Sequence, residues 1–427
     1  MNKNDSDLMK TSLESSGYVI ASEIESADIV VYNTCSVRAH AEDRVTARIL
    51  SDKKRIKEHG GIIIVAGCMA QRLGNELLKE KIADIVIGPY QSPGIDEVLH
   101  KYFGKERESL FLSQNDDDFK TRLDLRLVER IESNEWRQWV TITHGCENFC
   151  AYCIVPYVRG RLISFESKEI LNYTRSLLDK GIQEITLLGQ NVNQFGQDTG
   201  DIPFYSLLEK TAKLPGLARL NFLTSHPKDF SADIIRVIAD HSNISKSIHL
   251  PLQSGSNNIL EAMNRSYTFS HYMKLIGEIE RRLDTYAIST DLIVGFPGES
   301  LTDYEATLRA VENIRFDEAY MYAYSPREGT PAFALKELLS RDEKIERLNR
   351  LIDIQRSISK EKLSARINCV EEMIPEKTSR RSNGELIGRT FLNHPVVLTG
   401  DKSDIGRRLK IKVEAVNGST LQGTKIA

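Results

Sequence analysis

The sequence predicts an α/β chain in three parts: an alternating α/β unit, a partial, open (βα)6 barrel of the TIM type and a small all-β unit. In the first hundred residues, and again from residue 138, short apolar strands alternate with helical patterns, which implies parallel sheets covered by helices. Beyond residue 367, short alternating strands are separated by Gly, Asn and Asp turns, which is typical of a small β barrel or sandwich. A chain of 427 residues is long enough for about two to four domains.

The first unit, residues 1–103, is predicted to be a parallel sheet with helices on both faces. It opens on a helix rather than on a strand, as if its first strand were missing. Residues 104–135 are polar and acidic without a clear period, so we expect a linker there. The predicted strands are 28–34, 62–66 and 84–88, and the predicted helices are 5–18, 41–59, 74–81 and 93–103.

The second unit, residues 136–366, is predicted to hold six βα repeats, fewer than the eight of a closed barrel. A charged amphipathic helix at 341–366 then leads away from it. The predicted strands are 139–145, 184–190, 219–225, 246–252, 287–296 and 318–325, and helices are expected to begin near Ser167, Phe204, Ser231, Asn257 and Leu301.

The last unit, residues 367–427, is predicted to contain strands at 385–392, 394–400, 408–416 and 420–426. Residues 366–427 hold eleven Lys and Arg against seven Asp and Glu, whereas the whole chain has a net charge of −3. The overall charge argues against a protein that coats nucleic acid without selectivity, but a basic tail can still bind phosphates. The sequence contains no apolar run of about 18 residues and no leader, so we expect a cytoplasmic protein without a membrane anchor.

Three cysteines with the spacing CxxxCxxC follow the first barrel strand, at the end of the sheet where barrel enzymes place their active sites. Cys146, Cys150 and Cys153 can bind three corners of a [4Fe–4S] cube and leave the fourth iron open. An open iron can chelate S-adenosyl-L-methionine (SAM), so the loop predicts a radical SAM enzyme. Structural zinc is the alternative, but it normally takes four protein ligands, and no fourth Cys or His has a suitable spacing.

Five motifs extend the cysteine pattern: CENFCAYCIVPYVRGR (146–161), LLGQNVNQFG (187–196), HLPLQSGSNNILEAMNRSYT (249–268), STDLIVGFPGES (289–300) and AYSPREGTPA (323–332). With these motifs the chain resembles the methylthiotransferase family of radical SAM enzymes over nearly its whole length. That resemblance implies a flavodoxin-like N-terminal domain, a radical SAM barrel and a C-terminal TRAM domain that binds RNA.

Cys35 and Cys68 each follow a predicted parallel strand, so both thiols are expected to face one crevice. From spacing alone they could be small buried apolar residues or metal ligands. The resemblance implies that they bind a second, auxiliary [4Fe–4S] cluster. In that family a third cysteine lies just before a Met-Asn-x-x-Asp-Ser segment, which here is residues 1–6. We therefore expect the third ligand to precede residue 1, through a late start site or trimming rather than loss. Cys369 has no cysteine neighbour in the sequence, and we expect it to have a packing role rather than to bind a cluster.

Polar residues at the remaining strand ends are candidates for binding SAM. The backbone at Tyr152 is expected to meet the adenine, the Gln190 and Asn191 amides to meet the SAM amino group, and Ser225 to reach the ribose. His226 and His249 could equally be structural, and we leave them out of the site. The other candidates are Gln253, Arg265 and Asp291.

The resemblance implies methylthiolation of C2 of N6-isopentenyl-adenosine next to the tRNA anticodon. One SAM methylates a sulfur of the auxiliary cluster. A second is cleaved to a 5′-deoxyadenosyl radical, which takes hydrogen from C2 so that the base collects the methylthio group. Alternatives are methylthiolation of threonylcarbamoyl-adenosine in tRNA or of a ribosomal protein aspartate, and an RNA-binding or iron-sensing protein without turnover. The expected partners are the tRNA anticodon stem-loop and a reductant such as flavodoxin or ferredoxin, with the chain itself a monomer.

Overall fold

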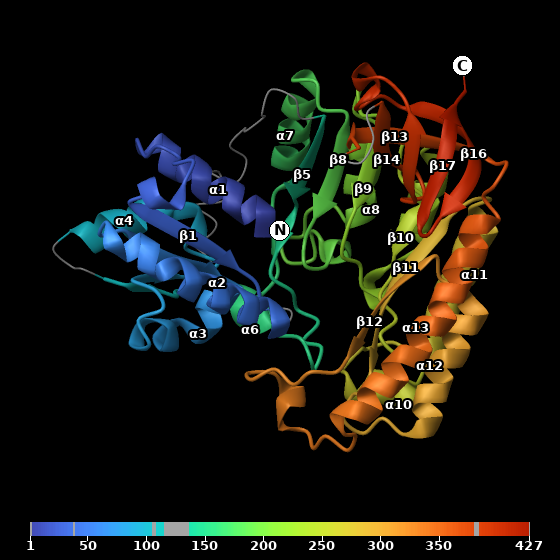
Figure 1. Cartoon of the computed structure of the whole chain (residues 1–427). Helices are drawn as coiled ribbons and strands as arrows, with labels where there is room; N and C mark the ends of the chain where they lie inside the picture. The colour runs from blue at the N-terminus through green and yellow to red at the C-terminus, as the bar shows by residue number, and fades with distance from the viewer. Residues whose placement is uncertain (1, 37–38, 105–107, 115–135, 380–383, 427) are drawn as a thin grey trace.

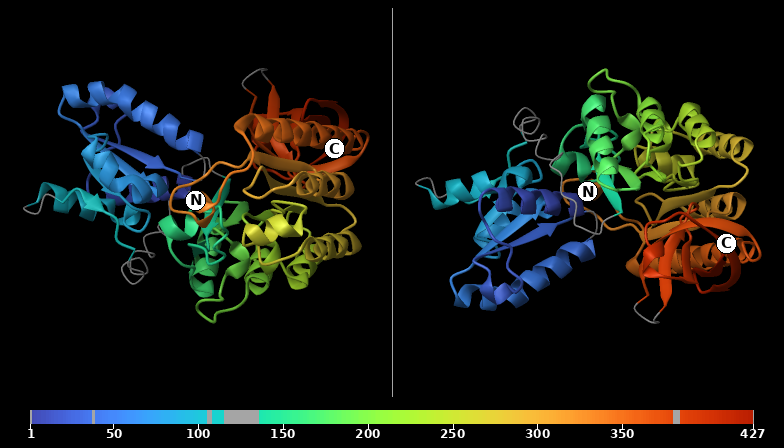
Figure 2. Two further views of the ribbon diagram at one scale, coloured as in Figure 1. Left: turned by 90° about the horizontal axis from the view of Figure 1, so that it is seen from below. Right: turned by 90° about the horizontal axis from the view of Figure 1, so that it is seen from above.

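The structure, a computed structural model, describes residues 2–36, 39–104, 108–114, 136–379 and 384–426. Three parts follow one another along the chain: an N-terminal α/β unit, a curved array of parallel strands with helices outside, and a small C-terminal barrel (Figure 1). The first and the last of these lie at opposite sides of the molecule (Figure 2). Within the described ranges no helix is long and apolar enough to cross a membrane.

The N-terminal unit is a four-stranded parallel sheet in the order β1-β2-β3-β4. Helices α1 and α4 cover one face of the sheet and α2 and α3 the other, because the buried residues separate into two clusters. The predicted alternation is confirmed. The elements are α1 (Asn2–Ser15), β1 (Ile29–Thr34), α2 (Ala39–Glu58), β2 (Ile62–Gly67), α3 (Cys68–Lys79), β3 (Ile85–Ile87), α4 (Ile95–Phe103) and β4 (Leu110–Phe111).

The segment predicted to be a linker contains the short strand β4, which pairs with β3 and so extends the N-terminal sheet. Residues 115–135 of that segment lie outside the described residues.

The middle part has six parallel barrel strands, as predicted, arranged as two sheets of three, β5-β8-β9 and β10-β11-β12. One isolated bridge, Leu220 to Ile244, joins the two sheets. Alternate residues of each strand face outward into a single apolar core with the surrounding helices. The strands are β5 (Arg137–Thr141), β8 (Glu184–Leu188), β9 (Arg219–Phe222), β10 (Ser247–His249), β11 (Ala287–Val294) and β12 (Glu318–Ala323).

The helices outside these strands begin where predicted, with one addition. The helical region after residue 257 divides in two, because Asn264 adopts a left-handed φ of 55° and the Thr268 side chain caps a new helix. The helices are α7 (Ser167–Asp179), α8 (Phe204–Ala212), α9 (Ala232–Asp240), α10 (Asn257–Ala262), α11 (Phe269–Arg282), α12 (Leu301–Ile314) and α13 (Arg341–Ser364).

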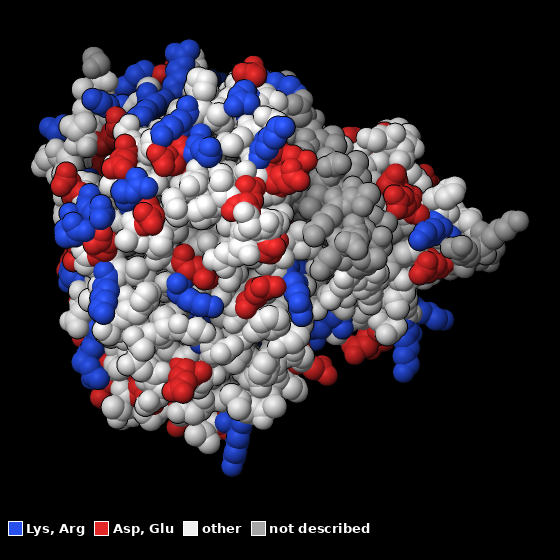
Figure 3. Space-filling model, turned by 180° about the vertical axis from the view of Figure 1, so that it is seen from behind, with Lys and Arg blue, Asp and Glu red and all other residues white. Residues whose placement is uncertain are grey.

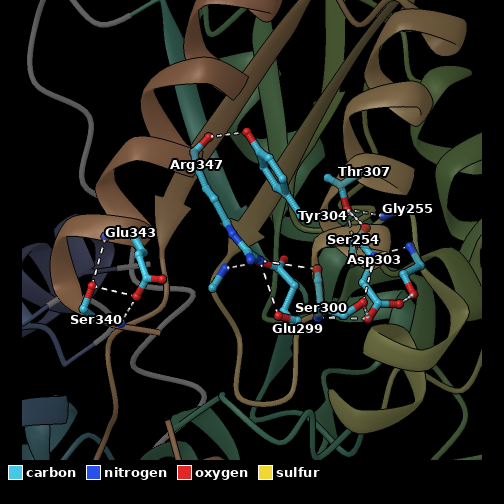
Figure 4. Close-up of polar contacts among 12 residues, drawn as sticks. Ser254, Gly255, Glu299, Ser300, Asp303, Tyr304, Thr307, Ser340, Glu343 and Arg347 are labelled. Atoms are coloured by element: carbon cyan, nitrogen blue, oxygen red, sulfur yellow. Dashed lines mark hydrogen bonds and ion pairs between the residues drawn. The ribbon is translucent and has the colours of Figure 1, made fainter. Parts of the chain in front are cut away.

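A polar network fixes the loops that follow β10 and β11 (Figure 4). Capping boxes begin α12 and α13, through Ser300 with Asp303 and through Ser340 with Glu343. Arg347 of α13 lies 2.6 Å from the buried Glu299 carboxylate, which also accepts from the Gly295 amide. The last helix of the middle part therefore holds the loop between β11 and α12.

The C-terminal part is a closed barrel in the order β13-β14-β15-β17-β16. Strand β13 is not among the predicted strands, because its two adjacent glutamates and Pro375 weaken the strand pattern. A register shift between Pro375 and Lys377 accommodates the proline. The strands are β13 (Val370–Thr378), β14 (Glu385–Thr390), β15 (Pro395–Thr399), β16 (Leu409–Asn417) and β17 (Thr420–Lys425).

The turn between β14 and β15 docks against the amino ends of the parallel strands. Arg219 donates to the backbone oxygens of Arg389 and Thr390 at 3.2 and 3.3 Å, and the Ser245 hydroxyl donates to the Phe391 oxygen at 2.8 Å. Buried Glu184 neutralises Arg219. The C-terminal barrel thus closes the end of the strand array opposite to the cysteine loop.

Asp317 reinforces this contact. Its carboxylate lies 2.7 Å from Lys362 and 3.8 Å from the His394 ring. Burial acts to raise the pKa of Asp317, but the hydrogen bonds from His394 and Lys362 and the Lys362 charge outweigh burial and hold it below its ordinary value.

We expect Asp317→Asn to lower the free energy of unfolding by about 2 kcal/mol near neutral pH, because it removes a nearly buried charge that accepts charged hydrogen bonds. A depressed pKa contributes stability above the ordinary carboxyl pKa, so the difference from wild type should shrink as the pH falls through the lowered pKa of Asp317. Urea unfolding followed by circular dichroism at several pH values measures this. The exposed neighbour Glu318, changed to Gln, is the matched control, and equal losses in both variants would contradict the assignment.

Candidate functional site

The cysteine loop occupies the carboxyl end of the first parallel strand. It runs from β6 (Thr143–His144) to the short helix α6 (Val155–Arg159), and β6 pairs with β7 (Ile163–Ser164) behind it. The loop backbone is held from both sides: Ala151 donates to Met263 at 2.9 Å and accepts from Ala332 at 2.8 Å. Cys150 is buried, while Cys146 and Cys153 are half-buried.

The thiols share a poorly hydrated environment. Burial, together with the nearby Cys150, raises the pKa of Cys146 to about 11 and that of Cys153 to about 12. Arg265 supplies the compensating charge, because its Nη1 lies 3.3 Å from the Cys150 sulfur. His226 Nε2 is 3.9 Å from the same sulfur, and burial, with the Arg265 charge, lowers the pKa of His226 to about 2, so the ring stays neutral.

This donor set fits a cluster better than a single ion. Among the described residues no three His, Cys, Asp or Glu side chains converge closely enough to hold one metal ion. The ligands of an iron–sulfur cube bind separate irons, so they do not need to meet at one point. Structural zinc requires four converging ligands.

The candidate SAM residues gather around this loop to different degrees. The Tyr152 hydroxyl lies 3.5 Å from Arg265 Nη1, and Arg265 also donates to the Pro251 oxygen at 3.0 Å. Asn191 is already engaged: it donates to Asp229 at 2.6 Å, and its oxygen accepts from the Asn193 amide. Asn191 therefore shapes the loop after β8.

Several buried polar atoms near the loop have no hydrogen-bond partner within the described part of the chain. Buried polar groups in native proteins are normally paired, so a group of unpaired ones indicates a polar ligand. SAM, with its amino, carboxylate and ribose groups, suits them. The atoms are Asn148 Nδ2, Asn193 Nδ2, Gln194 Oε1, Ser225 Oγ, Gln253 Oε1 and the Tyr324 hydroxyl.

The backbone is strained at the same end of the strands. Phe149 (φ 43°), Thr224 (φ 74°) and Gln253 (φ 70°) adopt left-handed conformations that non-glycine residues rarely take. Phe149 lies between two of the cysteines, and its oxygen accepts from Asn264 at 2.8 Å. Such strain concentrates at functional sites, where the surrounding structure enforces it.

The inward face of β10-β11-β12 carries a polar layer of which Asp291 was the only predicted site residue. The His249 ring lies 3.0 Å from the Ser289 hydroxyl through Nδ1 and 3.4 Å from the Asp291 carboxylate through Nε2. The Tyr320 ring is 6.0 Å from it, edge-on. These residues are only partly buried, whereas Ile248 and Leu292 on the opposite face are fully buried. The alternation of polar and apolar residues in STDLIV was the available signal.

Cys35 and Cys68 follow two neighbouring strands, at positions directly after the register partners Thr34 and Gly67. Cys68 is 6% exposed and is the first residue of α3. Burial raises the pKa of Cys68, the nearby Arg159 guanidinium opposes this, and the negative charge of Cys35 adds to it. Cys369 lies apart in the turn before β13, half-buried, and donates to the Ala365 oxygen at 3.7 Å.

Family models match all three parts of the chain. The Uncharacterized protein family UPF0004 matches residues 1–88, the Radical SAM superfamily residues 140–311, and the TRAM domain residues 375–426.

Two similar relatives are both named tRNA-2-methylthio-N(6)-dimethylallyladenosine synthase. That of Clostridium botulinum (strain Okra / Type B1) is 38% identical over 431 residues, covering 100% of this chain and 95% of the relative. That of Thermoanaerobacter pseudethanolicus is 40% identical over 428 residues, covering 99% of this chain and 90% of the relative.

A solved structure shares the fold. The radical S-adenosylmethionine methyltransferase TsrM from Kitasatospora setae superposes with a TM-score of 0.57 at 14% identity, over 77% of this chain and 72% of that one. The chain therefore belongs to the radical SAM methylthiotransferase family, among relatives named tRNA-2-methylthio-N(6)-dimethylallyladenosine synthase.

Proposed function

We propose that this chain methylthiolates C2 of N6-isopentenyl-adenosine next to the tRNA anticodon, giving 2-methylthio-N6-isopentenyl-adenosine. The observation that carries the proposal is the loop of Cys146, Cys150 and Cys153 at the carboxyl end of the parallel strands, beside the buried Arg265. Full-length similarity to relatives named for this modification supports the choice of substrate over threonylcarbamoyl-adenosine or a ribosomal protein aspartate.

The three loop thiols would hold the SAM-binding [4Fe–4S] cluster, and Cys35 and Cys68 would supply two of the ligands of the auxiliary one. When bound, SAM and the clusters supply one-electron chemistry and a sulfur source, which C2 of adenine requires because it is inert to polar reagents. Arg265 keeps its positive charge and donates to the Cys150 sulfur, so it offsets the negative charge of the thiolates.

Around SAM, the strongest supports are Ser225 and Gln253, whose buried oxygens are unpaired in the described chain. Tyr152, Gln190 and Asn191 complete the set, whereas Asp291, predicted as a SAM contact, lies beside His249 in the layer that we assign to the substrate base. Exclusion of water from this region during the reaction would protect reactive species from side reactions.

The adenine of the tRNA substrate binds against the inward polar layer, which consists of His249, Ser289, Asp291 and Tyr320. Its polar edge suits the His249 and Asp291 side chains, which are partly exposed on this face. Leu223, 46% exposed directly after β9, offers apolar contact for the isopentenyl group.

The C-terminal barrel binds the backbone phosphates of the tRNA anticodon stem-loop. Lys and Arg side chains gather over this end of the molecule (Figure 3). Arg407, Lys410 and Lys412 are exposed and make no ion pair with the described residues, whereas Arg408 and Lys425 are paired with acidic side chains.

Each predicted domain has its own role in the proposed reaction. Residues 1–103 together with strand β4 form the auxiliary-cluster unit, 136–366 the SAM barrel with its connecting helix, and 367–427 the RNA-binding unit; the rest of 104–135 links the first two in sequence. A reductant such as flavodoxin or ferredoxin supplies the electrons. The enzyme works as a cytoplasmic monomer.

Deletion of the gene tests the proposed function through nucleoside mass spectrometry of bulk tRNA. We expect 2-methylthio-N6-isopentenyl-adenosine to fall below detection and N6-isopentenyl-adenosine to accumulate. Wild-type protein should restore the modification, Cys369→Ser should restore it equally, and Cys150→Ala should not. Persistence of the methylthio group in the deletion strain would exclude this function. Loss from threonylcarbamoyl-adenosine instead would indicate the alternative tRNA substrate, and purified protein that releases no 5′-deoxyadenosine would indicate an RNA-binding protein.

Gly145 sets the start of the cysteine loop. A Cβ there would lie 1.7 Å from the Arg161 backbone oxygen, and φ is +69°. We expect Gly145→Ala to lose most of the iron bound by the loop after anaerobic reconstitution. Gly181→Ala is the matched control, because Gly181 has a φ of +94° but nothing within 4 Å of the added carbon. Equal iron content in the two variants would show that close packing at Gly145 does not matter.

Lys410 and Lys412 test the RNA surface. The double change to Gln should weaken tRNA binding and reduce the slope of log K against log salt by about 1.8, since each lost phosphate contact contributes about 0.9 in a duplex. Filter binding over a range of salt concentrations measures both. Lys210→Gln in α8 with Lys213→Gln just after it removes the same charge elsewhere and should leave the slope unchanged. A slope that falls equally in both pairs would contradict a localised contact.

A further inference from the structure

One buried side chain reaches from the cysteine loop to the other pair of cysteines. Arg159 ends α6, six residues after Cys153, and is 4% exposed. Its Nε donates to the Cys68 sulfur at 3.2 Å, and its Nη2 donates to the Asp5 carboxylate of α1 at 2.6 Å. A guanidinium from the SAM barrel thus lies inside the N-terminal unit.

The third nitrogen of this guanidinium is unpaired. Arg159 Nη1 is buried and finds no hydrogen-bond partner among the residues that the structure describes. An unpaired buried donor on a charged group lowers the stability of the fold by about several kcal/mol. Native proteins therefore rarely keep such a donor without a function. Asp5 neutralises the charge but leaves this donor vacant.

A second barrel arginine, Arg327, lies near the other thiol, that of Cys35. Arg327 is near enough to Cys35 for the two to interact electrostatically, and its side chain is only 12% exposed. It pairs with Glu42 of the N-terminal unit at 3.5 Å, and Arg72 binds the same carboxylate at 2.7 Å. The barrel therefore contributes one guanidinium group near each of the two thiols.

Apolar packing fixes the same contact. Ile154 and Val158, both buried, form a cluster with Cys68 itself. Because α6 follows Cys153 after a single residue, the position of Cys68 relative to the cysteine loop is set by one helical turn and its arginine.

We propose that Arg159 is a positioning residue for a sulfur-rich anion held by Cys35 and Cys68: it fixes the distance of that anion from the cysteine loop and donates its vacant Nη1 to it. This inference rests on the proposed function and deepens it. Hydrogen bonds from a buried cation to cluster sulfur stabilise the more negative, reduced state, and outer-shell partners of this kind commonly change metal affinity by about 10- to 100-fold.

The test uses the full chain with Cys146, Cys150 and Cys153 changed to Ala, so that only the Cys35 and Cys68 site is read. This protein is reconstituted anaerobically with iron and sulfide. Iron retained against a chelator and the reduction potential of the bound species are then measured. We expect Arg159→Met to retain iron about 10-fold more weakly. Arg159→Lys keeps the positive charge but loses the planar guanidinium with its several N–H donors. Because a hydrogen bond to the cluster sulfur is lost, the reduction potential should shift to more negative values.

Two controls separate this role from a simple ion pair between domains. Arg161→Met changes an exposed arginine of the same segment and should alter neither quantity. Asp5→Asn breaks the ion pair but leaves the bond from Arg159 to the Cys68 sulfur. It should increase amide hydrogen exchange in α1, cause a smaller loss of iron than Arg159→Met, and leave the potential no more negative than that of the parent.

The proposal is overturned if the parent protein binds no iron at this site, or if Arg159→Lys leaves the potential unchanged. It is also overturned if Asp5→Asn loses as much iron as Arg159→Met, since Arg159 would then act only by holding the domains together. None of these measurements involves tRNA or turnover, so their failure leaves the nucleoside assay of the proposed function unaffected.

Discussion

The arrangement of the two cysteine groups depends on a charge buried between domains. Arg159 belongs to the barrel by sequence, but its hydrogen bonds go to Cys68 and Asp5 of the N-terminal unit. A guanidinium cannot be left alone in an apolar interior, so the N-terminal unit must dock where Asp5 meets it. Docking in turn brings the carboxyl ends of two separate parallel sheets together. The chemistry proposed for this family member needs that proximity, because a group prepared at one site must reach a substrate activated at the other.

The parallel strands of the middle part form an open, partial barrel rather than a closed one. Its two sheets of three strands meet through one isolated bridge, and the inward face of β10-β11-β12 stays partly exposed. Side chains of a packed barrel core would be apolar, whereas His249, Ser289 and Asp291 form hydrogen bonds or ion contacts with one another. An open polar face of this kind is suited to admit a base that is still attached to a large nucleic acid.

The sequence was sufficient for features that are encoded locally. Strands and helices of the barrel follow from apolar runs and from capping serines such as Ser231, Ser300 and Ser340, which act within four residues. The CxxxCxxC loop is likewise local. Strand β13 was missed because its pairing compensates for Pro375 and for adjacent glutamates. The contact of Arg159 with Asp5 joins residues 154 positions apart, and no local pattern predicts it. His226 and His249 were ambiguous because only their neighbours in space distinguish a structural ring from a functional one.

The docking of the C-terminal barrel relies on main-chain acceptors. Arg219 and Ser245 donate to the backbone oxygens of Arg389, Thr390 and Phe391 rather than to their side chains. Substitutions of Arg389 and Thr390 can therefore leave these hydrogen bonds intact as long as the turn keeps its shape, whereas the Phe391 ring and the His394 side chain make contacts of their own with Arg219 and Asp317. The RNA-contacting module is thus attached through a few inward-facing groups of one turn, so residues on its outer surface can change without loosening the attachment.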